Sequence, residues 1–221
     1  AGGRLAQIRA MAQQKQVEAA RPDPQEALNE RVEGALQRAH AFFKELVEQM
    51  NLANAPIGSR GYSLTGVPEY DAFTWKAGHA DFATREVSNT KKLWERVSLS
   101  FTLSTNGGKA LQFNREFPAN ERLRQALGEC KIEYRSRDTL TEKGSLKHTT
   151  FEIPCEVKAY LELAAKYDTG KIVLRTRNVS HFGNHEHTIG PEAIDDASLD
   201  ELTGFILGES PRLGPLMLRG A

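Results

Sequence analysis

The feature that most constrains the fold is a change of hydrophobic period along the chain. Over residues 24–50 apolar side chains recur every three or four positions, which predicts one long amphipathic helix. Asp23 is placed to cap this helix, with Pro24 in its first turn and Glu26 as the capping-box partner. Over residues 97–104 apolar and polar side chains alternate instead, which predicts a strand with one buried face. The chain therefore combines helix with sheet.

The remaining patterns predict an α+β fold: an N-terminal long helix or helical hairpin, then a mainly antiparallel sheet with one inserted helix and a C-terminal helix. Asn106 and Gly107 predict a hairpin turn that leads into a return strand with Leu111 and Phe113. Asn120 is placed to cap the inserted helix at 118–129. Further strands are expected at 130–136, at 151–163 with Pro154 at an edge or bulge, and at 171–178; the last helix is expected at 191–208.

Residues 53–92 fit neither period and contain several glycines and prolines, so we expect a connecting segment without regular structure. Its aromatic side chains are too many for a solvated spacer, and they predict a segment that lies on a surface or forms a pocket wall. These aromatic residues are Tyr62, Tyr70, Phe73, Trp75 and Phe82. The chain then divides into a helical arm at 1–52, the connecting segment at 53–92, an α+β domain at 93–208 and a tail at 209–221.

The apolar stripe of the long helix has two possible uses. Its spacing fits a coiled coil, in which case the arm forms a homo-oligomer or binds a protein partner. The same stripe could instead pack on the sheet of its own chain. The expected association face consists of Leu28, Val32, Ala35, Ala39, Phe42, Leu46 and Met50.

The net charge limits the expected classes of partner, and the cysteines indicate the expected compartment. Lys and Arg total 29, as do Asp and Glu, so the formal net charge is zero and nucleic-acid binding is not expected. The apolar runs are too short to span a membrane. Cys130 and Cys155 are each expected within a strand as buried free thiols, which favours the cytoplasm.

A histidine-rich stretch at 177–190 is a candidate metal site. His185 and His187 stand two apart, so on a strand they share one face, and His181 or Glu192 could complete the ligand set for a divalent metal. The pair and the later glutamate resemble part of the first cupin motif, which implies metal binding. The glycines of that motif and its second half are missing here.

The same stretch is also a candidate ligand site. Asn178, Ser180 and Gly183 resemble the Asn/Asp-x-Ser-x-x-Gly half of the PilZ cyclic-dinucleotide receptor motif, which implies an anionic ligand. The paired arginines four apart in that family are absent. Arg175 and Arg177 on one strand, with Arg135 and Arg137 on another, could bind an anion instead, or could belong to an ordinary charged sheet face.

Stronger catalytic signatures are missing from the sequence. It contains neither a Gly-rich phosphate loop nor a Gly-x-Ser-x-Gly elbow, and no cofactor is predicted. His79 and Asp81 could form an acid–base couple, but without a visible nucleophile. We therefore expect a non-catalytic binding or assembly protein, with a small-molecule receptor or metal-dependent enzyme using residues 175–192 as the alternative.

Overall fold

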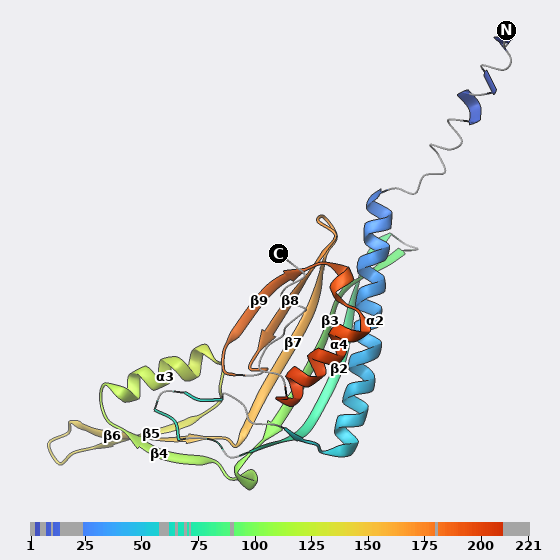
Figure 1. Cartoon of the computed structure of the whole chain (residues 1–221). Coiled ribbons are helices and arrows are strands. Elements are labelled where there is room, and N and C mark those ends of the chain that lie inside the picture. Colours follow the sequence, from blue (N-terminus) through green and yellow to red (C-terminus); the bar gives the residue numbers. More distant parts are fainter. Residues whose placement is uncertain are drawn as a thin grey trace.

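The computed structural model describes residues 3–4, 8–9, 11–13, 24–57, 62–64, 66–68, 70, 72–88, 91–179 and 181–209. It confirms the predicted α+β class: a long helix precedes a mostly antiparallel set of strands, with one helix inserted and one at the C-terminal end (Figure 1). The helices are α2 (Pro24–Ala53), α3 (Ala119–Glu129) and α4 (Asp196–Leu207). The strands are β1 (Pro56–Ile57), β2 (Phe73–Ser88), β3 (Lys91–Ser104), β4 (Leu111–Arg115), β5 (Arg135–Leu140), β6 (Leu146–Ile153), β7 (Glu156–Lys166), β8 (Lys171–Arg177) and β9 (Asn184–Ile189).

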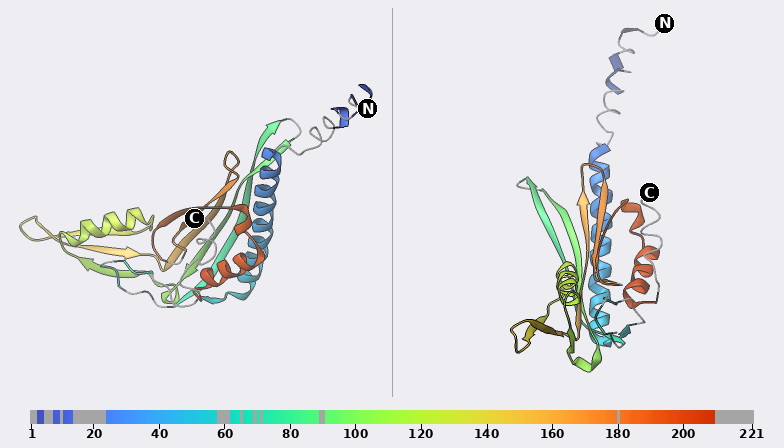
Figure 2. Two further views of the ribbon diagram at one scale, coloured as in Figure 1. Left: turned by 45° about the horizontal axis from the view of Figure 1, so that its top comes forward. Right: turned by 90° about the vertical axis from the view of Figure 1, so that its left-hand side faces the viewer.

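Six of the strands form one antiparallel sheet in the order β1-β2-β3-β7-β8-β9. At its centre Leu99 of β3 lies between Ala80 of β2 and Leu161 of β7. Helices α2 and α4 lie on the same face of this sheet (Figure 2). Between them they bury the alternate apolar residues of the strands in one continuous core.

The apolar stripe of α2 packs on this sheet. Val32, Ala35, Ala39 and Met50 are buried in the common core, and Phe42 and Leu46 pack partly buried against it, while Leu28 is half-buried beside Gly170. The most buried positions also include Leu36, Phe43 and Val47, about one residue further along the helix than the expected seam. The predicted association face is therefore occupied by the chain's own strands. Asp23 lies outside the described residues.

Strand β2 corrects the expectation that residues 53–92 lack regular structure. It pairs with β3 over most of its length, from Thr74 to Ser88. A bulge between Trp75 and Ala77 shifts the register, so that Trp75 and then Ala80 face the core. The apolar residues change from odd to even positions at this bulge, and the alternation that predicts a strand is lost from the sequence.

The other three strands form a small sheet in the order β4-β6-β5, which projects from one end of β3 and β7 (Figures 1 and 2). Helix α3 packs on it through Leu123 and Leu127, which meet Phe151 and Ile153 in a second, separate core. We call α3 with this sheet the small lobe. The predicted hairpin at Asn106 and Gly107 is wrong, because β3 already has β2 and β7 as neighbours and β4 pairs with β6 instead.

The expected strand at 151–163 is divided by Pro154. Strand β6 ends at Ile153 in the small lobe, and β7 begins at Glu156 in the large sheet. Pro154 lacks the N–H that a continuing ladder needs, so the chain changes sheets there. Two apolar runs of the same parity lie on either side of this break, which is why they read as one strand.

The predicted strand at 130–136 and the predicted helix cap at Asn120 are both wrong. Cys130 ends α3 rather than lying in a strand, and β5 begins only at Arg135. Asn120 lies inside α3, where its side chain donates to Thr149 Oγ1 at 3.0 Å. Both cysteines are buried free thiols, as predicted, although Cys155 lies between two strands. Among the described residues, none of the helices is long and apolar enough to cross a membrane.

Candidate functional site

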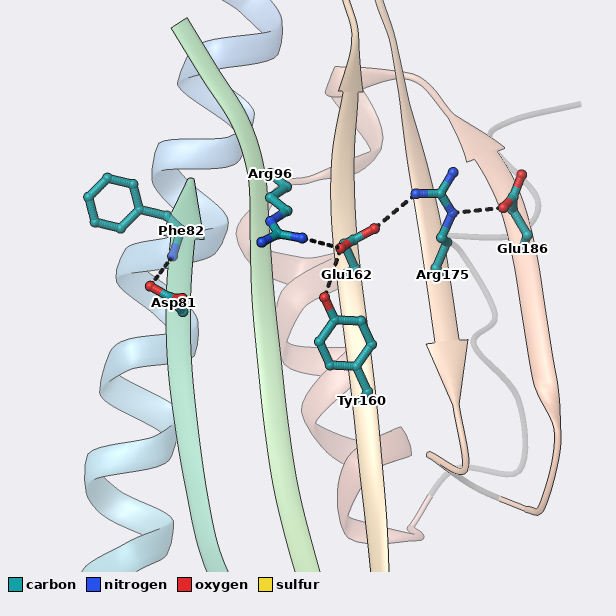
Figure 3. Close-up of polar contacts among 7 residues, drawn as sticks. All are labelled: Asp81, Phe82, Arg96, Tyr160, Glu162, Arg175 and Glu186. Atoms are coloured by element: carbon teal, nitrogen blue, oxygen red, sulfur yellow. Dashed lines mark hydrogen bonds and ion pairs between the residues drawn. The ribbon is translucent and has the colours of Figure 1, made fainter. Parts of the chain in front are cut away.

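The face of the six-stranded sheet away from α2 and α4 carries ordered rows of polar side chains. In Figure 3, α2 and α4 lie behind the strands, and we call the other side of the sheet the open face. Strand register aligns one residue from each of five strands, and a second row lies two residues along. The first row is Asp81, Ser98, Glu162, Arg175 and Glu186, and the second is His79, Ser100, Tyr160, Arg177 and Asn184.

Glu162 is the centre of the first row (Figure 3). Its side chain is only 10% exposed, yet it is bonded on both oxygens. Arg175 Nη1 donates to Oε1 at 2.9 Å, and the Tyr160 hydroxyl donates to Oε2 at 2.7 Å. Arg96 adds an ion pair to Oε2 at 3.7 Å. A buried carboxylate is tolerated only when its lone pairs are satisfied in this way, so these contacts fix Glu162 in place.

Arg175 extends the network to the edge of the sheet. Its Nε donates to Glu186 Oε2 at 2.8 Å while Nη1 holds Glu162, so one planar guanidinium links three strands (Figure 3). The hydrogen bond and charge of Arg175 lower the pKa of Glu186. Burial raises the pKa of the Tyr160 hydroxyl, and its bond to Glu162 raises that pKa further. The raised pKa keeps the Tyr160 hydroxyl neutral, and the lowered pKa keeps Glu186 ionised.

Asn178 and Gly183 of the PilZ-like motif make structural contacts. Asn178 is buried with φ 53°, and its side-chain amide donates to the carbonyl of Cys130 at 3.0 Å. The amide oxygen accepts from Gly183 N at 3.0 Å, which closes the β8–β9 loop. Tyr62 donates to the carbonyl of Asn178 at 2.7 Å. Asn178 therefore joins this loop to the small lobe; Ser180 lies outside the described residues.

The four predicted arginines do not form one patch. Arg175 and Arg177 lie on β8 of the large sheet, and Arg135 and Arg137 lie on β5 of the small lobe. Arg175 is engaged by two carboxylates, and Arg177 stacks over the Tyr160 ring, 5.5 Å from its centroid. The two pairs therefore come from different sheets of the chain.

The predicted metal ligands are brought together only in part. His185 Nε2 lies 2.7 Å from His181 Nε2, a hydrogen bond between the two rings that needs one of them neutral. Burial lowers the pKa of His185, and the neighbouring His181 and His187 lower it further. Glu192 instead pairs with Arg31 of α2 at 3.3 Å. Among the described residues, no group of three histidine, cysteine or acidic side chains is arranged to hold a metal ion.

The two residues of the acid–base couple lie in adjacent rows of the open face, His79 exposed in the second row and Asp81 in the first. Asp81 accepts from the backbone N of Phe82 at 2.8 Å (Figure 3). Phe82 itself points to the helical side, where it stacks on Trp94 with ring centroids 4.5 Å apart. His40 of α2 lies against both rings, and burial together with Lys44 lowers its pKa.

Sequence reasoning missed Glu162 as the central residue of the open face. Its only local signal is a polar position in the alternation of residues 156–163, which is shared with every other residue facing that way. The charge complementarity with Arg175 and Glu186 depends on the strand order β7-β8-β9, and a single sequence does not give strand order.

Comparison with known proteins adds no assignment: no family model, curated protein or solved structure matches this chain.

Proposed function

We propose that this is a non-catalytic binding or assembly protein that presents the open face of its six-stranded sheet to a protein partner. The observation that carries the proposal is the state of Glu162. Its oxygens are engaged by Tyr160, Arg175 and Arg96, so this buried carboxylate joins neighbouring strands and fixes the side chains around it on the surface of the sheet. A rigid face whose charges compensate one another suits docking.

The architecture supports a docking role for this face rather than for α2. The stripe of α2 is occupied by the chain's own sheet, so assembly would have to use another surface. Ser100 and Arg175 stand exposed on the open face, and the small lobe projects beside it. The two free thiols agree with a reducing compartment, and we propose the cytoplasm.

Native mass spectrometry tests the proposal on tag-free chain purified without chelator, with denaturing mass and metal analysis of the same sample. We expect a metal-free oligomer or a complex with a protein partner. Ser100→Arg adds bulk and charge to the open face and should dissociate it. Gln37→Arg, on the exposed side of α2, is the matched control and should leave it intact. A bare monomer from every preparation, or complexes that survive Ser100→Arg, would count against this role.

The contact between His181 and His185 supports a second candidate, a receptor or metal-dependent enzyme that uses residues 175–192. It predicts a monomer with stoichiometric metal or a bound small anion in the same experiment. His185→Ala together with His187→Ala should then remove the metal or anion. Retained occupancy would exclude this stretch as the site.

A further inference from the structure

Strand β5 of the small lobe is an open sheet edge. Among the described residues it pairs only with β6, in the register Arg135 opposite Glu152 to Leu140 opposite Leu146. Five of its six residues are exposed, and it contains no proline that would interrupt an added ladder. Edge strands commonly offer their unpaired N–H and C=O groups to another extended chain.

A hollow of about 610 Å³ lies along this edge. All six residues of β5 line it, together with Gln112, Thr150 and Glu152. Gln112 of β4, across β6 from β5, also lines the hollow, and the register places it on the same face as Glu152 and Arg135. The hollow therefore lies over this face of the sheet and extends to the edge, where one further strand would add side chains to it.

The charges of this edge favour a partner segment with acidic side chains. Arg135 and Arg137 stand two apart and so share one face of the sheet, about 7 Å apart along the strand. Arg135 is 88% exposed, and its nearest carboxylate oxygen, on Glu152, is 3.9 Å away. Arg137 forms no hydrogen bond or ion pair within the part of the chain that the structure describes. Asp138, on the other face, is already engaged by Arg124 and Thr149.

An added strand repeats the same two-residue spacing. Acidic side chains at alternate positions of that strand would face Arg135 and Arg137, and an apolar residue near its end would meet the exposed Leu140. Antiparallel pairing with β5 of a second copy would instead bring arginines of both copies onto one face, opposite or diagonal to each other, where like charges repel.

We propose that the β5 edge binds an extended peptide segment of a partner protein, with acidic residues at alternate positions, as an additional strand. This goes beyond the proposed function of the open face, because it uses a separate surface, on the other sheet of the chain.

Fluorescence anisotropy of labelled peptides on the full chain tests the proposal. The probe is GEVEVEVLG, and the control GEEEVVVLG has the same composition without the alternation. We expect the alternating peptide to bind at least about tenfold more tightly than the control, and to slow amide hydrogen exchange in β5 but not in β8.

Charge reversal locates the peptide on the chain. Arg135→Glu with Arg137→Glu should weaken its binding at least about tenfold. Lys143→Glu with Lys147→Glu makes the same change in net charge at exposed positions of the neighbouring hairpin and should weaken it much less. Three results would each overturn the proposal. They are equal losses of affinity for the two double variants, equal binding of the two peptides, and no binding up to about 1 mM peptide, which corresponds to a weak complex. The open-face role would still be judged by Ser100→Arg. A dimer that the arginine variants dissociate would point to a second copy instead.

Discussion

Removing the Phe43 side chain tests whether α2 is part of the core or a detachable arm. Phe43 is fully buried between α2 and the sheet, whereas Phe42 is only partly buried against the same core. A buried Phe→Ala change costs about 3–5 kcal/mol through lost burial and the cavity left behind. The better helix propensity of alanine returns about 0.5 kcal/mol. We therefore expect Phe43→Ala to lower the free energy of unfolding by roughly 3–4 kcal/mol, and Phe42→Ala by about half as much.

Urea unfolding followed by tryptophan fluorescence measures both losses, because Trp75 is buried in the same core and stacked on Phe101. The slope of the unfolding free energy against urea concentration should not change, and both variants should keep the oligomeric state of the parent in native mass spectrometry. The opposite pattern would refute the packing argument: a loss below about 1 kcal/mol for Phe43→Ala, with an oligomer that dissociates in Phe42→Ala, would identify the helix stripe as an association seam.

Three further predictions concern polar contacts. Asn51→Ala leaves the buried indole N–H of Trp75 and the backbone of Gly78 without their shared partner, and should cost about 2–3 kcal/mol of unfolding free energy in the same assay. Arg175 lowers the pKa of Glu186, so this pair stabilises the folded chain above the ordinary glutamate pKa, and that stability is lost as pH falls through the pKa of the folded state. In an NMR titration of the carboxyl groups, Arg175→Ala should raise the pKa of Glu186. An unchanged pKa would exclude the coupling. His40 has a lowered pKa, so the unfolded chain takes up its proton first and stability should fall as pH drops below about 6.5, a dependence that His40→Gln should weaken in urea titrations.

The elements that sequence alone predicted are those whose signal is local. Helix α2 and strand β3 show long unbroken periods. The prediction failed where the physics is nonlocal. The bulge after Trp75 moved the apolar residues of β2 to the other parity, and Pro154 separates two strands that belong to different sheets.

The candidate site follows the same division. Sequence marked Arg175 as a charged strand residue, but its role depends on which carboxylates the register brings to it. Asn178 belongs to a partial ligand motif in the sequence, whereas its side chain bonds the carbonyl of Cys130 at the end of α3 and the backbone N of Gly183 in its own loop. A polar residue that satisfies buried backbone groups and one that binds a ligand have the same letter in the sequence, and only the contacts distinguish them.

The contact between Asn178 and the carbonyl of Cys130 leads to a prediction about how the small lobe is held. The lobe has its own core, and this hydrogen bond of 3.0 Å ties the end of α3 to the β8–β9 loop. Burial raises the pKa of the Cys130 thiol, and the charge of Glu129 raises it further. The thiol should therefore react slowly with a disulfide reagent. Asn178→Gly can still adopt the positive φ of this position but removes the hydrogen bond to the Cys130 carbonyl. It should speed labelling of Cys130 severalfold, while the far-UV circular dichroism spectrum stays unchanged.

The matched comparison for this prediction is the other thiol. Cys155 lies where β6 passes into β7, and its carbonyl accepts from the backbone N of Thr105 at 2.9 Å, a bond that Asn178→Gly leaves in place. Mass spectrometry after timed labelling should therefore show Cys130 accelerated well beyond Cys155. If both thiols accelerate equally, the whole chain has been destabilised. If neither does, Asn178 only shapes its own loop, and the lobe is held by the covalent connections and side-chain packing instead.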